Sequence, residues 1–166
     1  MKLAGKAHVF GDNISTDLIA PGRLSHLRSN LPEFAKHVLE DADSEFPKKV
    51  KKGDFVVGGS NFGLGSSREH APTIIKLAGV SAVIAKSFAR IFYRNCINVG
   101  LPAIVLDTSE ISAGDELELD LDAGKLADKS KGKTYSFPAL PAVMQNILAD
   151  GGLVEHILAH GDFKIK

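Results

Sequence analysis

The chain has 166 residues, 44% hydrophobic and 24% charged, and its 20 basic side chains balance 20 acidic ones. This composition is typical of one compact soluble domain, and the zero net charge argues against a chain-wide attraction to nucleic acid or anionic lipid. No apolar run approaches the ~20 residues of a membrane span, and the N-terminus has no signal-peptide pattern, so we expect a cytoplasmic protein.

Cysteine and histidine usage limits the chemistry that this chain can perform alone. Cys96 is the one cysteine in the sequence, which excludes an internal disulfide. A lone thiol could not hold an iron–sulfur cluster or a structural zinc ion unaided. We interpret the six histidines as scattered, without the spacing of metal ligands such as HxxxH, and expect no metal site on this chain.

The first third of the chain is expected to hold two strands and one helix. Residues 5–10 form a short strand that leads directly into turn-forming residues. Residues 20–31 show no clear hydrophobic period and are expected to form a loop. A helix is expected to follow from residue 30 or 31, with Pro32 in its first turn. Residues 54–57 form a buried strand that ends at two glycines.

The next segment has the pattern of parallel α/β units. Helices are expected over residues 67–78 and 88–95, the second capped by Ser87. Short apolar runs at 81–85 and 101–106 suit strands that are buried on both faces. Strand, loop, helix, strand, helix and strand in this order predict a parallel sheet.

The last third predicts antiparallel pairing and two helices. Residues 116–121 alternate acidic and apolar side chains, as a half-buried strand does. We expect a polar, turn-rich segment at 122–133, a partner strand at 134–137, and helices at 141–149 and 152–160, the last with Leu153, Ile157 and Leu158 on one face. The predicted fold class is therefore α/β: one domain over residues 1–166, with a mixed, partly parallel sheet flanked by helices.

One glycine-rich loop carries the strongest chemical signal. Residues 63–70 read GLGSSREH, with glycines, two serines and an arginine before a predicted helix. Free amides at a helix N-terminus favour anions, and Arg68 can grip a carboxylate or phosphate through two hydrogen bonds. An ordinary helix cap with a salt bridge would use the same residues. The loop matches neither the P-loop nor the dinucleotide-binding pattern.

Three further segments have a chemical and a plain structural interpretation. Residues 11–17 (GDNISTD) could bind a cation, cap a helix or orient a catalytic histidine, and Asx turns use the same residue types. Arg28 lies in a predicted loop. It would contact a ligand only if that loop covers a binding site, and a loop arginine is otherwise solvated. Residues 86–95 mix bases and aromatics. We favour a core helix, with Phe88, Ile91 and Phe92 buried and Arg90 and Arg94 on a charged face, over nucleic-acid binding.

Four motifs together resemble the swivel domain of the aconitase family. They are GSSREHA at 65–71, AKSFARIFYRN at 85–95, GLP at 100–102 and STDLIAPGR at 15–23. The resemblance covers residues 5 to about 106. The chain is most similar to members of the family in which the swivel domain is a separate small subunit. It implies a swivelling β/β/α domain. It also implies a hydro-lyase that isomerises a hydroxy-acid by removing water and adding it back on the neighbouring carbon.

The resemblance also implies roles for particular residues. Ser66 would be the catalytic base, while Ser67 and Arg68 would hold a substrate carboxylate. Asp17 would orient a catalytic histidine of the partner chain, and Arg28 lies near the position of a further carboxylate-binding arginine. A [4Fe–4S] cluster would belong to a large subunit, and the substrate would be a di- or tricarboxylate. Open alternatives are an apolar or a carboxylate-bearing substrate arm, and a non-catalytic carboxylate-binding regulatory module.

Overall fold

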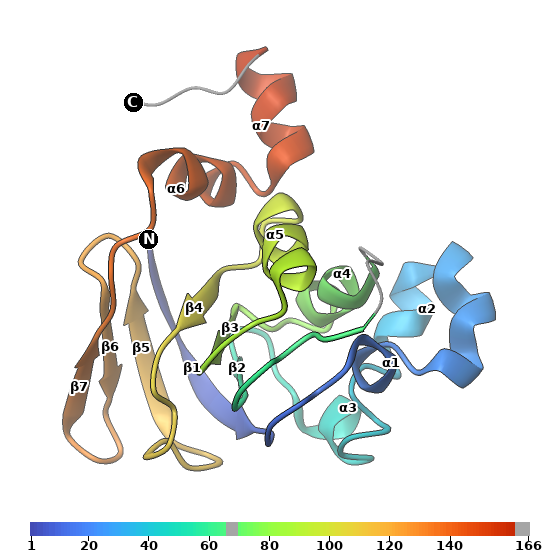
Figure 1. The fold of residues 1–166 in the computed structure, drawn as a ribbon, viewed down its shortest axis with the longest axis horizontal. Coiled ribbons are helices and arrows are strands. Elements are labelled where there is room, and N and C mark those ends of the chain that lie inside the picture. The colour runs from blue at the N-terminus through green and yellow to red at the C-terminus, as the bar shows by residue number, and fades with distance from the viewer. Residues whose placement is uncertain (66–69, 162–166) are drawn as a thin grey trace.

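A single mixed sheet organises the chain in a computed structural model that describes residues 1–65 and 70–161. Its seven strands stand in the order β4-β3-β2-β1-β5-β6-β7. The strands are β1 (Lys2–Val9), β2 (Phe55–Val57), β3 (Ala82–Ala85), β4 (Ala103–Val105), β5 (Glu116–Asp120), β6 (Lys125–Asp128) and β7 (Lys133–Ser136). The sheet curves into a half-barrel, with helices beside its parallel part (Figure 1). The predicted α/β class is confirmed.

Strand β1 joins two kinds of pairing within this sheet. Its last residues pair in parallel with β2, where Val9 lies opposite Val57. Its first residues pair with β5 in the antiparallel direction, with Lys2 opposite Asp120. Strands β3 and β4 continue the parallel part, and β6 and β7 continue the antiparallel part. The carboxyl ends of the parallel strands therefore meet along one edge of the sheet.

The helices are short and mostly follow the parallel strands. They are α1 (Thr16–Ile19), the 3₁₀ segment η1 (Gly22–Ser29), α2 (Leu31–Ala35), α3 (Phe46–Lys49), α4 (His70–Leu77), α5 (Arg90–Asn98), α6 (Ala142–Ala149) and α7 (Leu153–His160). Within the described ranges, no helix is long and apolar enough to cross a membrane.

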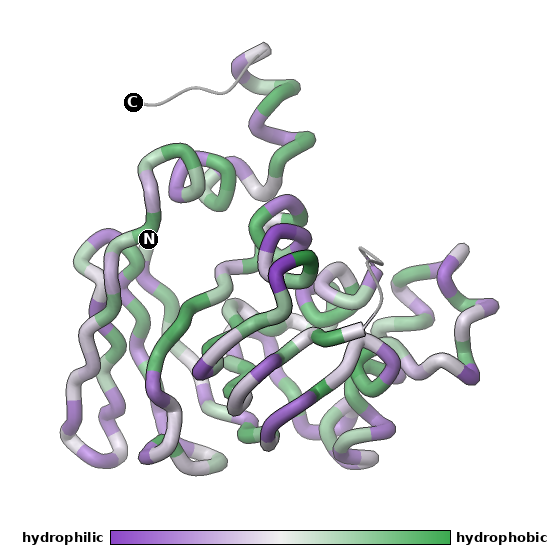
Figure 2. The backbone as a smooth tube through the Cα atoms, in the orientation of Figure 1, coloured by the Kyte–Doolittle hydropathy of each residue, from purple (hydrophilic) through white to green (hydrophobic). Residues whose placement is uncertain are grey.

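Two cores lie on opposite faces of the parallel strands. Val56 and Val83 belong to the core shared with α1 to α5, whereas Phe55 and Ile84 belong to the core shared with β5 and β6. Successive strand residues point to opposite faces, so both faces of β2 and β3 are buried. The tube in Figure 2 accordingly runs green along these strands. This explains why their sequences are unbroken apolar runs.

Two segments expected to be irregular are regular, so those predictions were wrong. Residues 20–31 contain η1, whose Leu24 and Leu27 pack against the core although they show no helical period. Residues 122–133 contain β6, in which Leu126 and Asp128 are buried among turn-forming residues. The strand expected at 134–137 therefore pairs with β6 and not with the strand at 116–121.

Three local predictions were also wrong. Ser87 does not cap α5, because Ala89 occupies that position and makes no side-chain cap. Ile91 is 49% exposed and not part of the core. On α7, Leu153 packs against the core cluster of α5 and α6, but Ile157 and Leu158 are exposed and the side chain of His156 is buried in their place.

Candidate active site

The loops that follow β1, β2 and β3 lie side by side beyond the sheet and are joined by hydrogen bonds. We call them the loop platform, comprising residues 10–16, 58–65 and 86–89. Between the first two loops, the Gly59 amide donates to the Gly11 carbonyl at 3.1 Å and the Asn13 amide donates to the Ser60 carbonyl at 2.8 Å. The hydrogen-bond pattern of the sheet thus continues into its loops, and this satisfies backbone groups that would otherwise need water.

The same pairing continues to the residues that flank position 66. The Gly63 amide donates to the Ile14 carbonyl at 2.7 Å, and the Thr16 amide donates to the Leu64 carbonyl at 2.9 Å. Ser15 and Leu64 form a parallel bridge. The start of α1 is therefore held beside the chain that enters residues 66–69.

The third loop is fixed to the second from the other side. Phe62 donates its amide to the Ser87 carbonyl and accepts from the Ala89 amide, both at 3.0 Å. The Ser87 hydroxyl oxygen accepts from the Asn61 amide at 2.7 Å. Ser87 therefore locks two loops together instead of starting a helix.

Asp12 has a comparable structural role. Its Oδ1 accepts a hydrogen bond from the Ser60 amide at 2.7 Å. This carboxylate oxygen joins the first loop to the second. The sequence indicated a turn-forming aspartate directly after a strand, but it did not show that the partner of Asp12 is the Ser60 amide.

Two glycines allow the loops to approach so closely. Gly63 has φ +84°, and a Cβ added there would lie 2.1 Å from Cγ of the Phe92 ring. Gly65 has φ +111°, and its Cβ would lie 3.1 Å from Oγ1 of Thr16, whose side chain is buried. Positive φ and close contact both require glycine at position 63. The backbone that enters residue 66 is thereby fixed in direction.

Asp17 lies in the first turn of α1, on the exposed side. Ser15 caps this helix, with its hydroxyl oxygen accepting from the Leu18 amide at 3.2 Å. A Cβ on Gly22 would lie 3.5 Å from Oδ1 of Asp17, so η1 begins against this carboxylate. The structure therefore brings Asp17 to the loop platform, one residue after the Thr16 contact with the loop that ends at Gly65.

The sequence-predicted residues Ser66, Ser67 and Arg68 lie outside the described residues. On their far side, the ring of His70 stacks on Phe34, with centroids 5.7 Å apart. Both flanks of the segment are thus anchored, on α1 at one end and on α2 at the other.

Arg28 lies on η1 and is exposed. The nearby Arg23 fixes the start of η1 through Nη2, which contacts Glu40 Oε1 at 2.5 Å and Asp41 Oδ1 at 2.9 Å. These carboxylates raise the pKa of Arg23. No contact between described side chains joins Arg28 to Asp17, so the structure brings Asp17 to the platform but leaves Arg28 in solvent.

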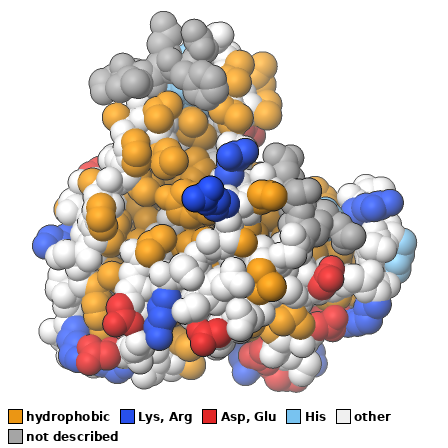
Figure 3. Space-filling model, viewed as in Figure 1, with side chains coloured by type: hydrophobic (Ala, Val, Ile, Leu, Met, Phe, Trp, Pro, Cys, Tyr) orange, Lys and Arg blue, Asp and Glu red, His pale blue; other side chains and the backbone are white. Residues whose placement is uncertain are grey.

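An apolar groove of about 650 Å³ adjoins the platform through Phe88, which contacts Phe62 ring to ring. Figure 3 shows hydrophobic side chains gathered on this face around basic ones. The groove lies between α5 and α6 and is lined by Phe88, Tyr93, Ile97, Val105, Val143 and Met144, among others. Val105 is 52% exposed although it belongs to a strand. Contiguous apolar surface of this kind marks interaction sites.

Cys96 cannot serve as a cluster ligand in this fold. It is fully buried within α5, and burial raises the pKa of its thiol well above the ordinary value. Iron–sulfur clusters are bound by thiolates, several per cluster. The residues of this chain therefore do not fit such a group.

Comparisons with known proteins agree with this architecture. The family described as aconitase C-terminal domain matches residues 6–109. A 3-isopropylmalate dehydratase small subunit 2 from Archaeoglobus fulgidus is 61% identical over 165 residues, covering 99% of this chain and 100% of that protein. Small subunit 1 of the same enzyme from Thermotoga maritima is 60% identical over 162 residues, covering 97% of this chain and 98% of the relative.

A solved structure extends the likeness to three dimensions. The crystal structure of a 3-isopropylmalate dehydratase from Methanocaldococcus jannaschii superposes with a TM-score of 0.91 at 49% identity, covering 97% of this chain and 96% of that one. Sequence, fold and loop arrangement lead to one conclusion: the chain belongs to the aconitase C-terminal domain family, together with the small subunits of 3-isopropylmalate dehydratase.

Proposed function

We propose that this chain is the small subunit of a 3-isopropylmalate dehydratase, a hydro-lyase of leucine biosynthesis that acts in the cytoplasm with a separate large subunit. The observation that carries the proposal is near-full-length identity of about 60% to small subunits of that name. The loop platform supports it, because it places an exposed carboxylate and the flanks of GSSRE at the edge where parallel sheets place ligands.

Ser66 is assigned as the catalytic base. It removes a proton from the carbon next to a substrate carboxylate, and the C–H electron pair forms a C=C bond with the neighbouring carbon. The hydroxyl on that carbon takes a proton from an acid supplied by the large subunit and leaves as water. Water then adds back with the hydroxyl and hydrogen exchanged between the two carbons. A serine hydroxyl is a weak base, so its alkoxide must be strongly stabilised. The cation of Arg68, neighbouring amide groups and a helix N-terminus are the sources of that stabilisation that the sequence around Ser66 offers.

Ser67 and Arg68 are assigned to a substrate carboxylate. Negative charge builds on this carboxylate as the neighbouring C–H bond breaks. An arginine that holds it through two hydrogen bonds therefore stabilises the transition state more than the ground state. Gly65, held against Thr16, would give the segment a fixed origin from which these side chains reach the substrate.

Asp17 is assigned to position a histidine of the large subunit. A carboxylate that accepts from one ring nitrogen fixes the tautomer and orientation of an imidazole. Asp17 is exposed on the first turn of α1, as a residue that serves a second chain must be. The apolar groove beside Phe88 would be covered by the same large subunit.

The [4Fe–4S] cluster is assigned to the large subunit, because the only cysteine of this chain is sealed in the core. When bound there, it would supply the Lewis acid for the departing hydroxyl. The small subunit alone is therefore expected to be inactive.

The proposal also covers which side chain the substrate carries. The names of the relatives favour the isopropyl group. Arg28 on η1 would suit a distal carboxylate, as in a homoaconitase, and a dimethylmalate-type substrate is a further alternative. Co-expression with the large subunit, followed by assays with isopropylmalate, homocitrate-type acids and substituted malates, tests this. Turnover of isopropylmalate at the highest kcat/KM is expected. A stable complex that turns over none of them would favour the regulatory module.

A further inference from the structure

Two histidines and one aspartate converge where α6 meets α7. His156 and His160 stand four residues apart on α7, which corrects the expectation that the histidines lack HxxxH spacing. That spacing puts both rings on one face of a helix. Asp150 is the C-cap residue of α6 and reaches this face across the turn between the two helices. Both helices lie beyond α5, away from α1, α2 and α3 (Figure 1).

The three side chains share a single carboxylate oxygen. Oδ2 of Asp150 lies 2.6 Å from Nδ1 of His156 and 2.9 Å from Nε2 of His160. The two ring centroids are 4.8 Å apart, and the three candidate ligand atoms all lie within 4.8 Å of one another. The Asp150 carboxylate oxygen therefore lies between the two imidazole rings.

Burial fixes one side of the cluster and leaves the other open. The side chain of His156 is fully buried, whereas those of His160 and Asp150 are 23% and 28% exposed. A ring held by packing loses little freedom on binding an ion, and an exposed side leaves room for an ion and a water ligand to enter.

We propose that Asp150, His156 and His160 bind a divalent first-row transition metal ion of the zinc class. Two imidazole nitrogens and one carboxylate oxygen are a ligand set that zinc takes, with water in the fourth position. Tetrahedral ligands about 2.0–2.2 Å from the ion stand roughly 3.3 Å apart. The two O–N distances of 2.6 and 2.9 Å must therefore open by about 0.7 and 0.4 Å, which a small movement of the partly exposed cap residue Asp150 can provide.

The ion would replace hydrogen bonds as the connection between α6 and α7. It would fix the orientation of α7, whose Val154 and Leu158 side chains are 65% and 81% exposed. This site does not depend on the proposed enzyme function, because it lies on helices that contribute nothing to the loop platform.

Zinc binding by the full-length chain tests the proposal. In equilibrium dialysis against Zn²⁺, we expect one saturable ion per chain. His160→Gln should weaken it at least about tenfold, since even the outer partners of metal ligands change affinity by 10- to 100-fold. His26→Gln, which removes an exposed histidine on η1, should leave the affinity unchanged.

Circular dichroism establishes that the variants fold. If His160→Gln does not, Asp150→Asn, which keeps an acceptor oxygen but removes the charge, should show the same weakening. Absence of stoichiometric binding in the unaltered chain would overturn the proposal. So would equal affinity in the unaltered chain and in whichever of these two variants folds.

Discussion

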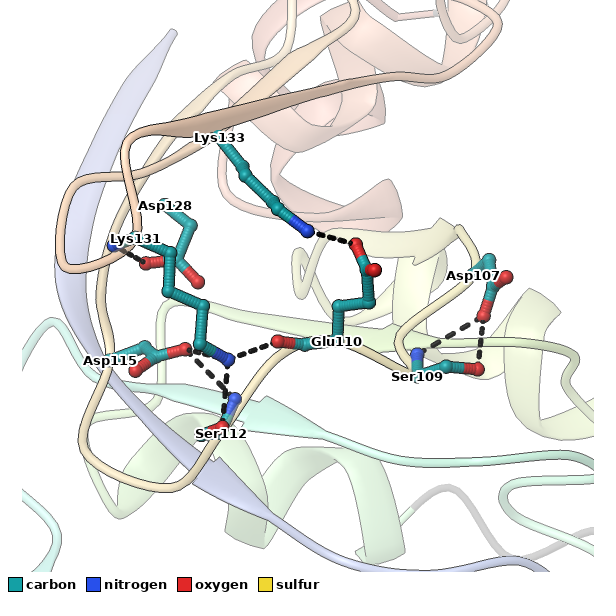
Figure 4. A network of polar contacts seen from close by, with 8 residues as sticks. All are labelled: Asp107, Ser109, Glu110, Ser112, Asp115, Asp128, Lys131 and Lys133. Carbon is teal, nitrogen blue, oxygen red and sulfur yellow. Dashed lines mark hydrogen bonds and ion pairs between the residues drawn. The ribbon is translucent and has the colours of Figure 1, made fainter.

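The parallel and antiparallel parts of the sheet handle polar groups in opposite ways. In the parallel part, β2 and β3 are buried on both faces, and the polar groups gather in the loop platform at the strand ends. In the antiparallel part, β5 alternates exposed acidic with buried apolar residues. Its polar groups are joined to one another in a network at the hairpin end (Figure 4).

Lys131 is the centre of that network. Its ammonium contacts Asp115 Oδ2 at 3.1 Å and donates to the Ser112 hydroxyl at 2.7 Å and to the carbonyl of Glu110. Its amide donates to Asp128 Oδ1 at 3.2 Å. Asp115 and Asp128 are 8% and 1% exposed, so two buried carboxyl groups contact Lys131, one through its ammonium and the other through its amide.

The comparison separates polar groups that stabilise the fold from polar groups that are candidates for binding and catalysis. In the antiparallel network, charged and polar side chains mostly bind one another. The loop platform is joined mainly by backbone hydrogen bonds, and Asp17, which follows its first loop, is exposed on α1. We therefore expect substitutions in the segment that follows Gly65 to alter activity. Substitutions in the antiparallel network should alter only the free energy of unfolding.

The largest expected effect is that of Ser66→Ala on activity. Loss of the base should reduce kcat of the reconstituted complex by about 10³-fold or more, as removal of a group central to the chemistry does. Assembly with the large subunit and thermal unfolding should be unchanged, because only one oxygen atom is removed. Steady-state kinetics alongside size-exclusion chromatography measures both, and near-normal turnover would remove Ser66 from this role.

Gly63→Ala should strongly destabilise the platform. A positive φ costs an L-residue about 1–2 kcal/mol, and the new Cβ would overlap Phe92, adding about 1–3 kcal/mol. Gly114→Ala is the matched control: its φ is +88° and a Cβ there meets nothing within 4 Å. Urea unfolding should therefore show the larger loss for Gly63→Ala. Equal losses would mean that contact with Phe92 does not matter.

Lys131→Met should destabilise the antiparallel part without affecting kcat. It leaves the buried carboxylate of Asp115 without its cation, at a cost of about 1–3 kcal/mol for a partly exposed pair. Lys129→Met is the control, because its ion pair with Glu118 is more than half exposed. Altered turnover in the Lys131 variant would break the separation between the two parts.

The smallest expected effect is the pH dependence of Asp128→Asn. Burial, followed by the neighbouring carboxyl group of Asp115, raises the pKa of Asp128 above its ordinary value of 3.8. Asp128 is 1% exposed, and its Oδ2 has no hydrogen-bond partner among the described residues. Between the two pKa values, the folded chain holds a proton that the unfolded chain releases. The unfolding free energy contributed by this group therefore falls as pH rises through that window.

The asparagine variant has no such proton to lose and keeps an acceptor for the Lys131 amide. Its stability relative to the unaltered chain should therefore rise with pH from about 3.8 upward and then level off. Urea unfolding of both proteins from pH 4 to 7 measures this difference. A fall in the stability of the variant relative to the unaltered chain as pH rises would contradict the raised pKa of Asp128.

The sequence predicted the parallel part well because local pattern and tertiary environment agree there. Runs such as Ala82–Ala85 are apolar throughout and lie between two cores. It failed at β6, where Leu126 and Asp128 are buried but neighbouring residues have turn chemistry. It also failed on α7, where His156 occupies the inward face in place of Ile157 because Asp150 binds its ring.

The sequence alone determined the order of the parallel strands and of the helices between them, and it gave the family resemblance, because short-range spacing and residue chemistry carry that information. The same information indicated the candidate residues Asp17, Ser66, Ser67, Arg68 and Arg28. Only the tertiary structure decided which of the described polar groups meet. Asp12 binds Ser60 and Ser87 binds Asn61 across long stretches of chain, and Asp150 joins two histidines of the next helix. Such pairings depend on how strands align in space, since hydrogen bonds and ion contacts form only within a few ångströms.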